Sequence, residues 1–124
     1  MLRQLRARTH QVLTALAVLQ TGSGRLLLDI CVTDVPMRAY SDAEIEAYVA
    51  SGDPLDKAGA YAIQHAGFHP VKSLDGCYAN VVGLPLCHLA RMLHRLGLPP
   101  RANLPLACQA ALGYQCPVYE QILP

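Results

Sequence analysis

The sequence predicts an α/β protein in which a partial mixed β-sheet is flanked by helices. Two long stretches rich in aliphatic and β-branched residues come first, and segments with helical caps and apolar periodicity follow them. A length of 124 residues fits one domain with a core of its own. Hydrophobic residues make up 52% and charged residues 15% of the chain. That balance is typical of a chain that buries most of its elements, or of one that lacks a partner surface.

The first part of the chain predicts a β-hairpin. Residues 1–8 combine leucines with arginines and indicate the end of a helix. Apolar stretches at about 10–20 and 25–38 flank the linker Thr21–Gly24, whose glycines suit a turn with positive φ. Polar residues such as Asp29 interrupt the second stretch, which indicates a face partly open to solvent or to a site. Helix is the alternative for the first stretch.

The middle of the chain predicts one helix, a second helical turn and a strand. Ser41–Glu44 has the sequence of a capping box, in which a serine and a glutamate satisfy each other's backbone amides at the start of a helix. Gly52 ends this helix. Residues 55–64 predict a second short helix or helical turn, and residues 68–74 predict a strand.

The last third predicts two helices. Pro85 suits the first turn of a helix, and Gly97 closes it. The apolar stripe of this helix is formed by leucines: Leu86, Leu89, Leu93 and Leu96. Residues 103–112 predict a further helix, and the segment around Cys116 is predicted to be irregular. We therefore expect a domain at 1–97 and a tail with a short helix at 98–124.

Charge and cysteine content narrow the class of protein. A net charge of +1, one phenylalanine and no tryptophan argue against binding to a nucleic acid polymer or an anionic membrane. The five cysteines form no C-x-x-C pair, which indicates reduced, buried thiols in a cytoplasmic protein. Arginines before the apolar run 12–19 leave a targeting peptide as the alternative. Cys108 and Cys116 could pair in an oxidising compartment.

The richest set of polar residues lies between positions 53 and 64. It holds Asp53, Asp56, Lys57, Tyr61 and Gln64, separated by small residues that allow a ligand to approach the backbone closely. A lysine there can serve a phosphate as a point charge. Spacing alone favours a plainer interpretation, in which an exposed Asp-Lys pair starts a helix and the small residues permit close packing.

Four motifs, taken together, resemble a known family. Residues 8–14 read Arg-Thr-His-Gln-Val-Leu-Thr, and residues 41–45 read Ser-Asp-Ala-Glu-Ile. Residues 56–64 read Asp-Lys-Ala-Gly-Ala-Tyr-Ala-Ile-Gln, and residues 80–85 read Asn-Val-Val-Gly-Leu-Pro. In this order they resemble the Maf-like proteins, which are nucleoside triphosphate pyrophosphatases. The resemblance covers residues 1–97 and implies the C-terminal half of a Maf-like (ITPase-like) fold.

The resemblance implies an enzyme that cleaves a nucleoside triphosphate to the monophosphate and pyrophosphate with a divalent metal, Mg or Mn. Gln64 matches the branch that acts on dTTP and UTP, where this position helps to select the base. Lys57 and Asp56 would lie beside the same cleft, Lys57 facing phosphate or bracing the loop. The family's catalytic aspartate is expected upstream of Met1, so no catalytic residue is assigned.

We therefore expect little turnover from this chain alone, and the alternative is a non-catalytic nucleotide-binding or interaction remnant. A sheet cut at mid-fold leaves an unpaired edge and an apolar surface, so we also expect either self-association into a homo-oligomer or marginal stability.

Several positions depart from the family pattern or invite another interpretation. His65 and Ala7 stand where the family has glycine, and His65 could crowd the pocket. His88 and His94 are too far apart on their helix for one metal ion, and we expect both to face solvent. Residues 80–85 are interpreted as packing and turn geometry rather than a site.

Overall fold

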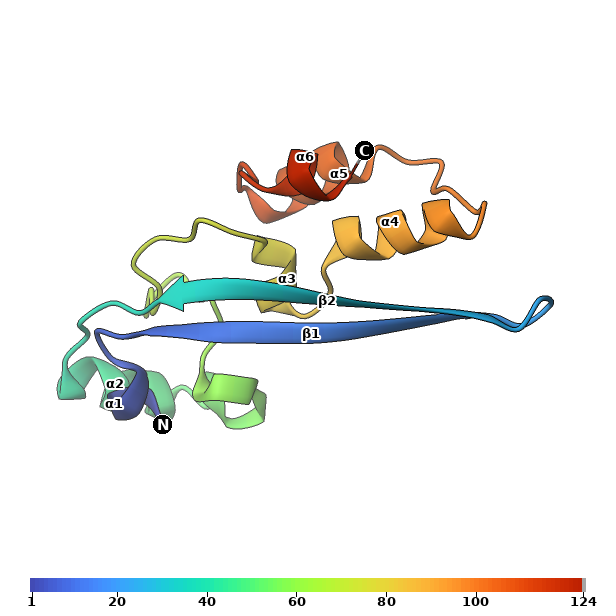
Figure 1. The fold of residues 1–124 in the computed structure, drawn as a ribbon. Coiled ribbons are helices and arrows are strands. Elements are labelled where there is room, and N and C mark those ends of the chain that lie inside the picture. The colour runs from blue at the N-terminus through green and yellow to red at the C-terminus, as the bar shows by residue number, and fades with distance from the viewer. Residues whose placement is uncertain (124) are drawn as a thin grey trace. The chain divides into compact units, whose positions relative to one another are not determined.

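The computed structural model describes residues 1–123 and contains one β-hairpin with short helices (Figure 1). Strands β1 (Thr9–Gln20) and β2 (Arg25–Pro36) pair in a two-stranded antiparallel sheet, so the helical alternative for the first stretch is wrong. Gly24, with φ 69°, lies in the turn between them. The α/β class is confirmed, and this antiparallel pair is the sheet formed by the described residues.

The chain divides into two compact units, each described by itself. Unit 1 contains residues 1–11 and 34–74, and unit 2 contains residues 12–33 and the chain from Asp75 onward. The base of the hairpin thus belongs to unit 1 and the rest of it to unit 2. The boundary between residues 97 and 98 stays a proposal, and the last residue of that tail, Pro124, lies outside the described residues.

Unit 1 begins with helix α1 (Leu2–Leu5), which a tight backbone bend connects to β1. Ala7 forms this bend in the left-handed region, with φ 57°. A side chain is strained there and glycine is not, which gives a physical reason for the family's glycine at this position. The buried Tyr40 hydroxyl donates to the Leu2 carbonyl at 2.8 Å and holds α1 in place.

Helix α2 (Asp42–Ala50) starts at the predicted capping box. The Glu44 amide donates to Ser41 Oγ at 3.1 Å, and the Ser41 amide donates to Glu44 Oε2 at 2.7 Å. Gly52, with φ 78°, ends the helix as predicted. The predicted second helical segment forms two 3₁₀ turns, η1 (Asp53–Asp56) and η2 (Ala58–Ala60).

The strand predicted at 68–74 is wrong. This segment forms one isolated bridge, at Val71. His69 has φ 46°, outside the extended region, and Pro70 has no amide to donate to a ladder. The Arg38 side chain instead donates to the His69 carbonyl at 2.9 Å and fixes the segment without a second ladder.

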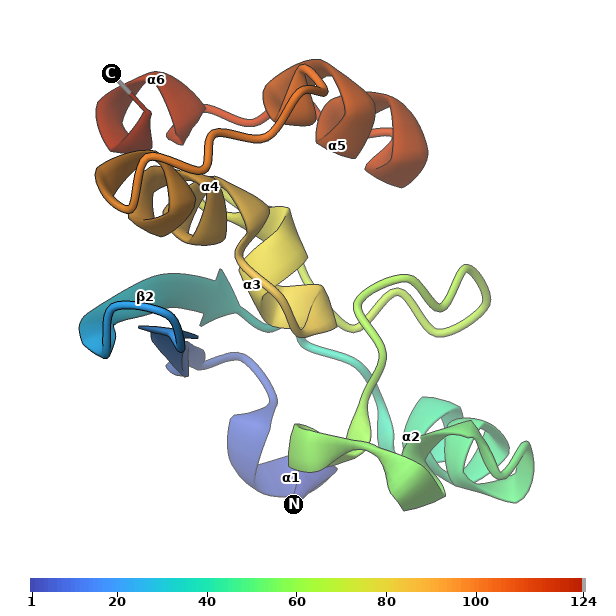
Figure 2. The ribbon, with the colours of Figure 1, turned by 90° about the vertical axis from the view of Figure 1, so that its right-hand side faces the viewer.

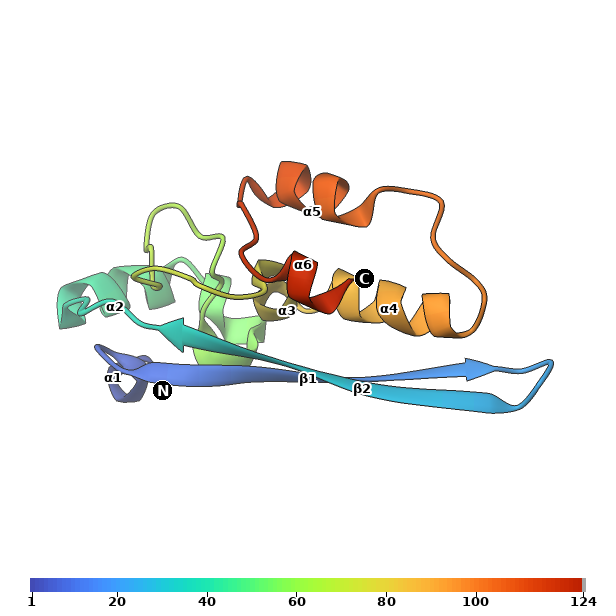
Figure 3. The same ribbon diagram turned by 45° about the horizontal axis from the view of Figure 1, so that its top comes forward.

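Unit 2 packs its helices against one side of the hairpin (Figures 1 and 3). Figure 2 shows α5 and α6 beside α4. Asn103 caps α5 by accepting the Leu106 amide at 3.1 Å. The segment around Cys116 is irregular, as predicted, and a short helix that was not predicted follows it. The bounds are α3 (Tyr78–Val82), α4 (Leu86–Arg95), α5 (Leu104–Leu112) and α6 (Tyr119–Ile122). No helix among residues 1–123 is long and apolar enough to cross a membrane.

The two faces of the hairpin in unit 2 differ. Side chains alternate across a strand, and on β2 the inward residues Cys31 and Thr33 are buried. Six of the outward side chains on the two strands are large and aliphatic, yet between 47% and 70% of each is exposed. This outer apolar face consists of Leu13, Leu19, Leu26, Leu28, Ile30 and Val32.

Asn80 joins both strands to α3. Only 1% of it is exposed, and its Nδ2 donates to the Val12 carbonyl at 3.0 Å and to Thr33 Oγ1 at 2.9 Å. The Thr33 hydroxyl in turn contacts the Cys77 carbonyl at 3.4 Å. These contacts support the interpretation of the Asn-Val-Val-Gly motif as packing.

The core of unit 2 is rich in free thiols. Cys31 and Cys77 form a buried cluster with Ala79, against which Cys108 packs. All five cysteines are unpaired, including Cys108 and Cys116. Burial, with the neighbouring Cys77 thiol, raises the pKa of Cys31 to about 12, so this thiol stays protonated at neutral pH.

Candidate functional site

The candidate site is the loop of unit 1 that follows α2. Gly52 turns the chain out of the helix, and Pro54 starts η1 with a fixed φ. Lys57 is extended, and Gly59, with φ 77°, bends η2. A methyl group at Gly59 would lie 3.1 Å from the Tyr61 ring, so the turn leaves little room for a side chain. The small residues of the motif therefore serve a tight local turn.

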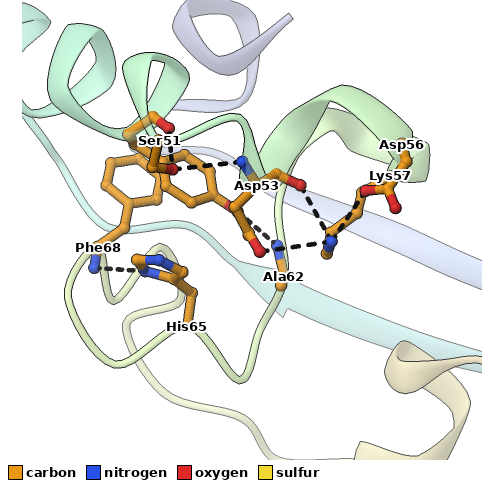
Figure 4. A network of polar contacts seen from close by, with 8 residues as sticks. Ser51, Asp53, Asp56, Lys57, Ala62, His65 and Phe68 are labelled. Carbon is orange, nitrogen blue, oxygen red and sulfur yellow. Dashed lines mark hydrogen bonds and ion pairs between the residues drawn. The ribbon is translucent and has the colours of Figure 1, made fainter.

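Lys57 is held by two carboxylates and a carbonyl (Figure 4). Its Nζ lies 3.0 Å from the Asp53 carbonyl, 3.0 Å from Asp56 Oδ1 and 3.5 Å from Asp53 Oδ1. An ammonium group has three donors, so these acceptors can use all of them. The Asp56 side chain is 83% exposed, whereas those of Asp53 and Lys57 are about 30% exposed.

Tyr48 connects this ion pair to the end of the loop. Its hydroxyl donates to Asp53 Oδ2 and accepts the Ala62 amide at 3.0 Å. Its ring stacks on Phe68, with centroids 4.3 Å apart and an angle of 12° between the planes. Only 3% of Tyr48 is exposed. Packing and hydrogen bonds thus both fix the hydroxyl.

Electrostatics keep the three charged groups ionised. The hydrogen bond from Tyr48 lowers the pKa of Asp53 below its ordinary value, and Lys57 lowers it further. The hydrogen bond from Lys57 lowers the pKa of Asp56, and the same contact raises the pKa of Lys57. At neutral pH the loop therefore carries two carboxylates and one ammonium group.

Gln64 lies exposed in the turn that follows Ala62. The structure therefore brings Lys57 and Asp56 into direct contact and places Gln64 two residues beyond the amide that Tyr48 holds. A hollow of about 200 Å³ lies nearby in unit 1, and its lining includes none of the three predicted residues. It is lined by Glu44, Ala47, Tyr48, Ser51, His65, Gly67 and Phe68.

His65 has a defined place in this turn. Its Nδ1 accepts the Phe68 amide at 3.0 Å, and its ring meets the Tyr48 ring edge-on at 4.8 Å. His65 is also not among the residues with positive φ, so it does not need the torsion that favours glycine. The side chain at this position closes the turn rather than straining it.

A second buried polar contact pairs His10 with Tyr61. His10 Nε2 lies 2.9 Å from the Tyr61 hydroxyl, and the rings meet edge-on at 5.6 Å. Burial raises the pKa of Tyr61 to about 12 and lowers the pKa of His10. Both groups are therefore neutral at pH 7, so this pair adds no charge to the site.

In unit 2, Asp29, His88 and Arg91 form a charged cluster, and the place of His88 in it differs from the prediction. His88 was expected to face solvent, but only 12% of its side chain is exposed and its Nδ1 lies 3.3 Å from Asp29 Oδ2. Arg91 Nη2 donates to the same oxygen at 2.6 Å. This cluster ties α4 to β2, because the inward carboxylate needs partners when it leaves water. His94 is exposed, as expected.

Within residues 1–123, no group of three or more histidine, cysteine, aspartate or glutamate side chains could hold a metal ion. Asp53 and Asp56 both contact Lys57, which competes with a metal ion for their oxygens. The side chains that the structure describes therefore do not fit a resident divalent metal.

The sequence did not single out Tyr48 as part of the site. It lies on the buried side of α2, where an aromatic side chain is ordinary core. One signal was available: a buried tyrosine hydroxyl needs a partner, and Asp53 follows Tyr48 by five positions.

Comparisons with known proteins identify similar chains. A family model described as "Maf-like protein" matches residues 1–96. A protein named dTTP/UTP pyrophosphatase from Dehalococcoides mccartyi is 43% identical over 100 residues, which are 81% of this chain and 45% of that protein. One with the same name from Dictyoglomus thermophilum is 48% identical over 96 residues, 77% of this chain and 50% of that protein.

The similarity to a third relative extends further along the chain. The dTTP/UTP pyrophosphatase of Thermomicrobium roseum is 45% identical over 122 residues, 95% of this chain and 53% of that protein. This match reaches past Gly97, into the segment that the sequence left without a family interpretation. The chain spans about half the length of the curated relatives that it matches.

Proposed function

This chain belongs to the Maf-like protein family, and from that membership we propose that it binds pyrimidine nucleoside triphosphates through the loop at residues 53–64. The proposed reaction cleaves dTTP or UTP to the monophosphate and pyrophosphate. The relatives named dTTP/UTP pyrophosphatase support it at 43–48% identity. We also propose a cytoplasmic location, which the five unpaired thiols support.

One observation carries the proposal: the loop is a fixed turn with the Lys57 ammonium group near its start and the exposed side-chain carboxamide of Gln64 at its end. Lys57 is held in one place by Asp53 and Asp56, and Gln64 faces solvent. A nucleotide needs positive charge for its phosphates and hydrogen-bonding groups for its base. This loop offers both kinds of group within eight residues of sequence.

Gln64 is the proposed base-reading residue. A carboxamide both donates and accepts hydrogen bonds, so it can match a donor and an acceptor on the edge of uracil or thymine. A site built to hydrogen-bond a substrate group rejects a base that cannot satisfy it. Replacing Gln64 with alanine should therefore weaken dTTP binding.

Lys57 is the proposed phosphate-facing residue, and Asp56 is its exchangeable partner. The Asp56 carboxylate is 83% exposed, so it can leave Lys57 at little cost when a phosphate arrives. The Asp53 contacts would then keep the ammonium group in place. If Lys57 only braces the loop, Lys57→Met should lower stability and leave affinity for the triphosphate unchanged in the folded protein.

Magnesium or manganese remains the proposed cofactor of the family reaction. A divalent ion would neutralise charge on the phosphates. Because both carboxylates of the loop contact Lys57, we assign neither of them as a catalytic base.

The test is binding and turnover measured in parallel. Calorimetry with dTTP and UTP should show binding that depends on Gln64, with Gln64→Ala at least about fivefold weaker. Pyrophosphate release should be slow from this chain alone, because no described residue is assigned as a catalytic base. Fast release with Mg or Mn would overturn that expectation. Slow release that depends on Gln64 would favour the enzyme, and binding with no detectable release would favour the second candidate function, a non-catalytic nucleotide-binding protein.

We also propose that two copies associate through the outer apolar face of the hairpin in unit 2. Its six aliphatic side chains are each about half exposed, and covering them would contribute about 1 kcal/mol apiece. We therefore expect a weak dimer by sedimentation, abolished by Leu28→Lys, because a charge on this face would lose its water on association. A monomer at about 100 µM, a concentration at which weak specific contacts are populated, would contradict it.

A further inference from the structure

We infer that Tyr48 is a positioning residue that holds the base-reading and phosphate-facing ends of the loop in one geometry. The inference rests on the proposed function of Gln64 and Lys57. It adds a residue from α2, outside the nucleotide-facing motif itself. Tyr48 touches neither the base nor the phosphates in this role and acts through the groups that it binds.

The Tyr48 hydroxyl connects the two ends of the loop. It donates to Asp53 Oδ2 while the other oxygen of that carboxylate, Oδ1, lies 3.5 Å from Lys57 Nζ. It also accepts the Ala62 amide at 3.0 Å. One oxygen atom thus connects the lysine's carboxylate partner to the backbone two residues before Gln64.

Among residues 1–123, Tyr48 is the one side chain that is hydrogen-bonded to both the Asp53 carboxylate and the Ala62 amide. The Asp53 carboxylate pairs with Lys57 and accepts from Tyr48. Losing the hydroxyl would leave the Ala62 amide, partly buried, without that acceptor, and would free one oxygen of Asp53. The turn to Gln64 would then keep the hydrogen bond from the His65 amide to the Ala62 carbonyl and the side-chain contacts of His65 and Tyr61, but it would lose its link to the carboxylate partner of Lys57.

The Tyr48 ring is fixed independently of its hydroxyl. Tyr48 stacks on Phe68 at 4.3 Å and meets the edge of His65 at 4.8 Å. Tyr48→Phe therefore keeps the aromatic packing and removes one oxygen atom. The variant separates the positioning role from the contribution of Tyr48 to the core.

The position of Gln64 would determine the selectivity for a pyrimidine over a purine. Hydrogen bonds weaken steeply when their geometry is lost, and displacements of about 1 Å in a positioned group cost large factors in function. A mobile Gln64 would lose contacts to the pyrimidine without gaining contacts to a purine. We therefore expect affinity for dTTP to fall towards that for dATP.

The experiment compares Tyr48→Phe with Tyr40→Phe, a matched control in the same unit. Tyr40 is also buried and lies outside the loop, and its hydroxyl donates to the Leu2 carbonyl rather than to the loop carboxylate. For each protein we would measure the ratio of dTTP to dATP affinity, the amide exchange of residues 62–64 and unfolding in urea. Tyr48→Phe should lower the ratio about fivefold to tenfold and speed exchange at Ala62 about tenfold. Tyr40→Phe should leave both unchanged.

A double-mutant comparison excludes a purely structural effect of Tyr48→Phe. In a Gln64→Ala background, Tyr48→Phe should not change the affinity ratio further, because the group that it positions is gone. An unchanged ratio in the single Tyr48→Phe variant, with wild-type nucleotide binding intact, overturns the inference. If the wild-type chain binds no nucleotide, the proposed function fails instead. Amide exchange then decides the positioning claim, and unchanged exchange at Ala62 overturns it.

Discussion

Replacing Asn80 with alanine should destabilise unit 2 by about 2–4 kcal/mol. The Asn80 amide is 1% exposed and donates to the Val12 carbonyl and to Thr33 Oγ1. Each buried group left without its partner costs about 1–3 kcal/mol, and the smaller side chain leaves a cavity. Asn80 Oδ1 is itself buried without a partner, so its removal returns part of that loss.

Urea unfolding of both proteins at equal, low concentration, followed by tyrosine fluorescence, measures the difference. Thr33→Val is the matched variant, because it keeps the shape of the side chain and removes the hydroxyl that accepts from Asn80 and donates weakly to the Cys77 carbonyl. In a double-mutant cycle the two changes should couple by about 1 kcal/mol, since they share one hydrogen bond. A cost below about 0.5 kcal/mol for Asn80→Ala would refute the role of Asn80 as the link between β1, β2 and α3.

Three further predictions follow from local geometry and charge. Ala7→Gly should stabilise the protein by up to about 1 kcal/mol, because residue 7 has φ 57°; an unchanged midpoint in thermal unfolding would contradict this. The pKa of Asp29 is lowered: its burial acts in the opposite direction, but the Arg91 hydrogen bond and weaker contacts outweigh it. Its contribution to stability is therefore present above the ordinary value of about 3.9 and lost as pH falls through the folded value, so Asp29→Asn should flatten the acid limb of stability against pH. Cys31, with a pKa of about 12, should resist iodoacetamide at pH 8 in the native protein and react in urea; mass spectrometry of the labelled peptides would show it.

Local signals predicted much of the fold. The capping box of α2, the glycine turn of the hairpin and the helix predicted at 103–112 each depend on neighbours in sequence, so residue type and spacing were enough. The strand at 68–74 failed because its outcome depends on distant groups. A proline, a left-handed His69 and the Arg38 side chain replace the ladder that apolar alternation suggested.

The site divides in the same way. The contact of Lys57 with Asp56 could be predicted from the sequence, because opposite charges on adjacent residues of a loop meet easily. Tyr48 was not, since its hydroxyl reaches Ala62 across fourteen positions and the connection exists only after α2 and the loop have packed. The prediction that His88 faces solvent was wrong for a similar reason. Its partner Asp29 lies on another element, fifty-nine positions away.

Amide chemical shifts of the labelled chain during a dTTP titration would show whether residues 53–64 bind a pyrimidine nucleoside triphosphate. We predict the largest saturable changes at residues 56–64, with smaller ones for dATP at equal concentration. Changes confined to unit 2, or equal at residues 56–64 for the two nucleotides, would rule out pyrimidine recognition by this loop.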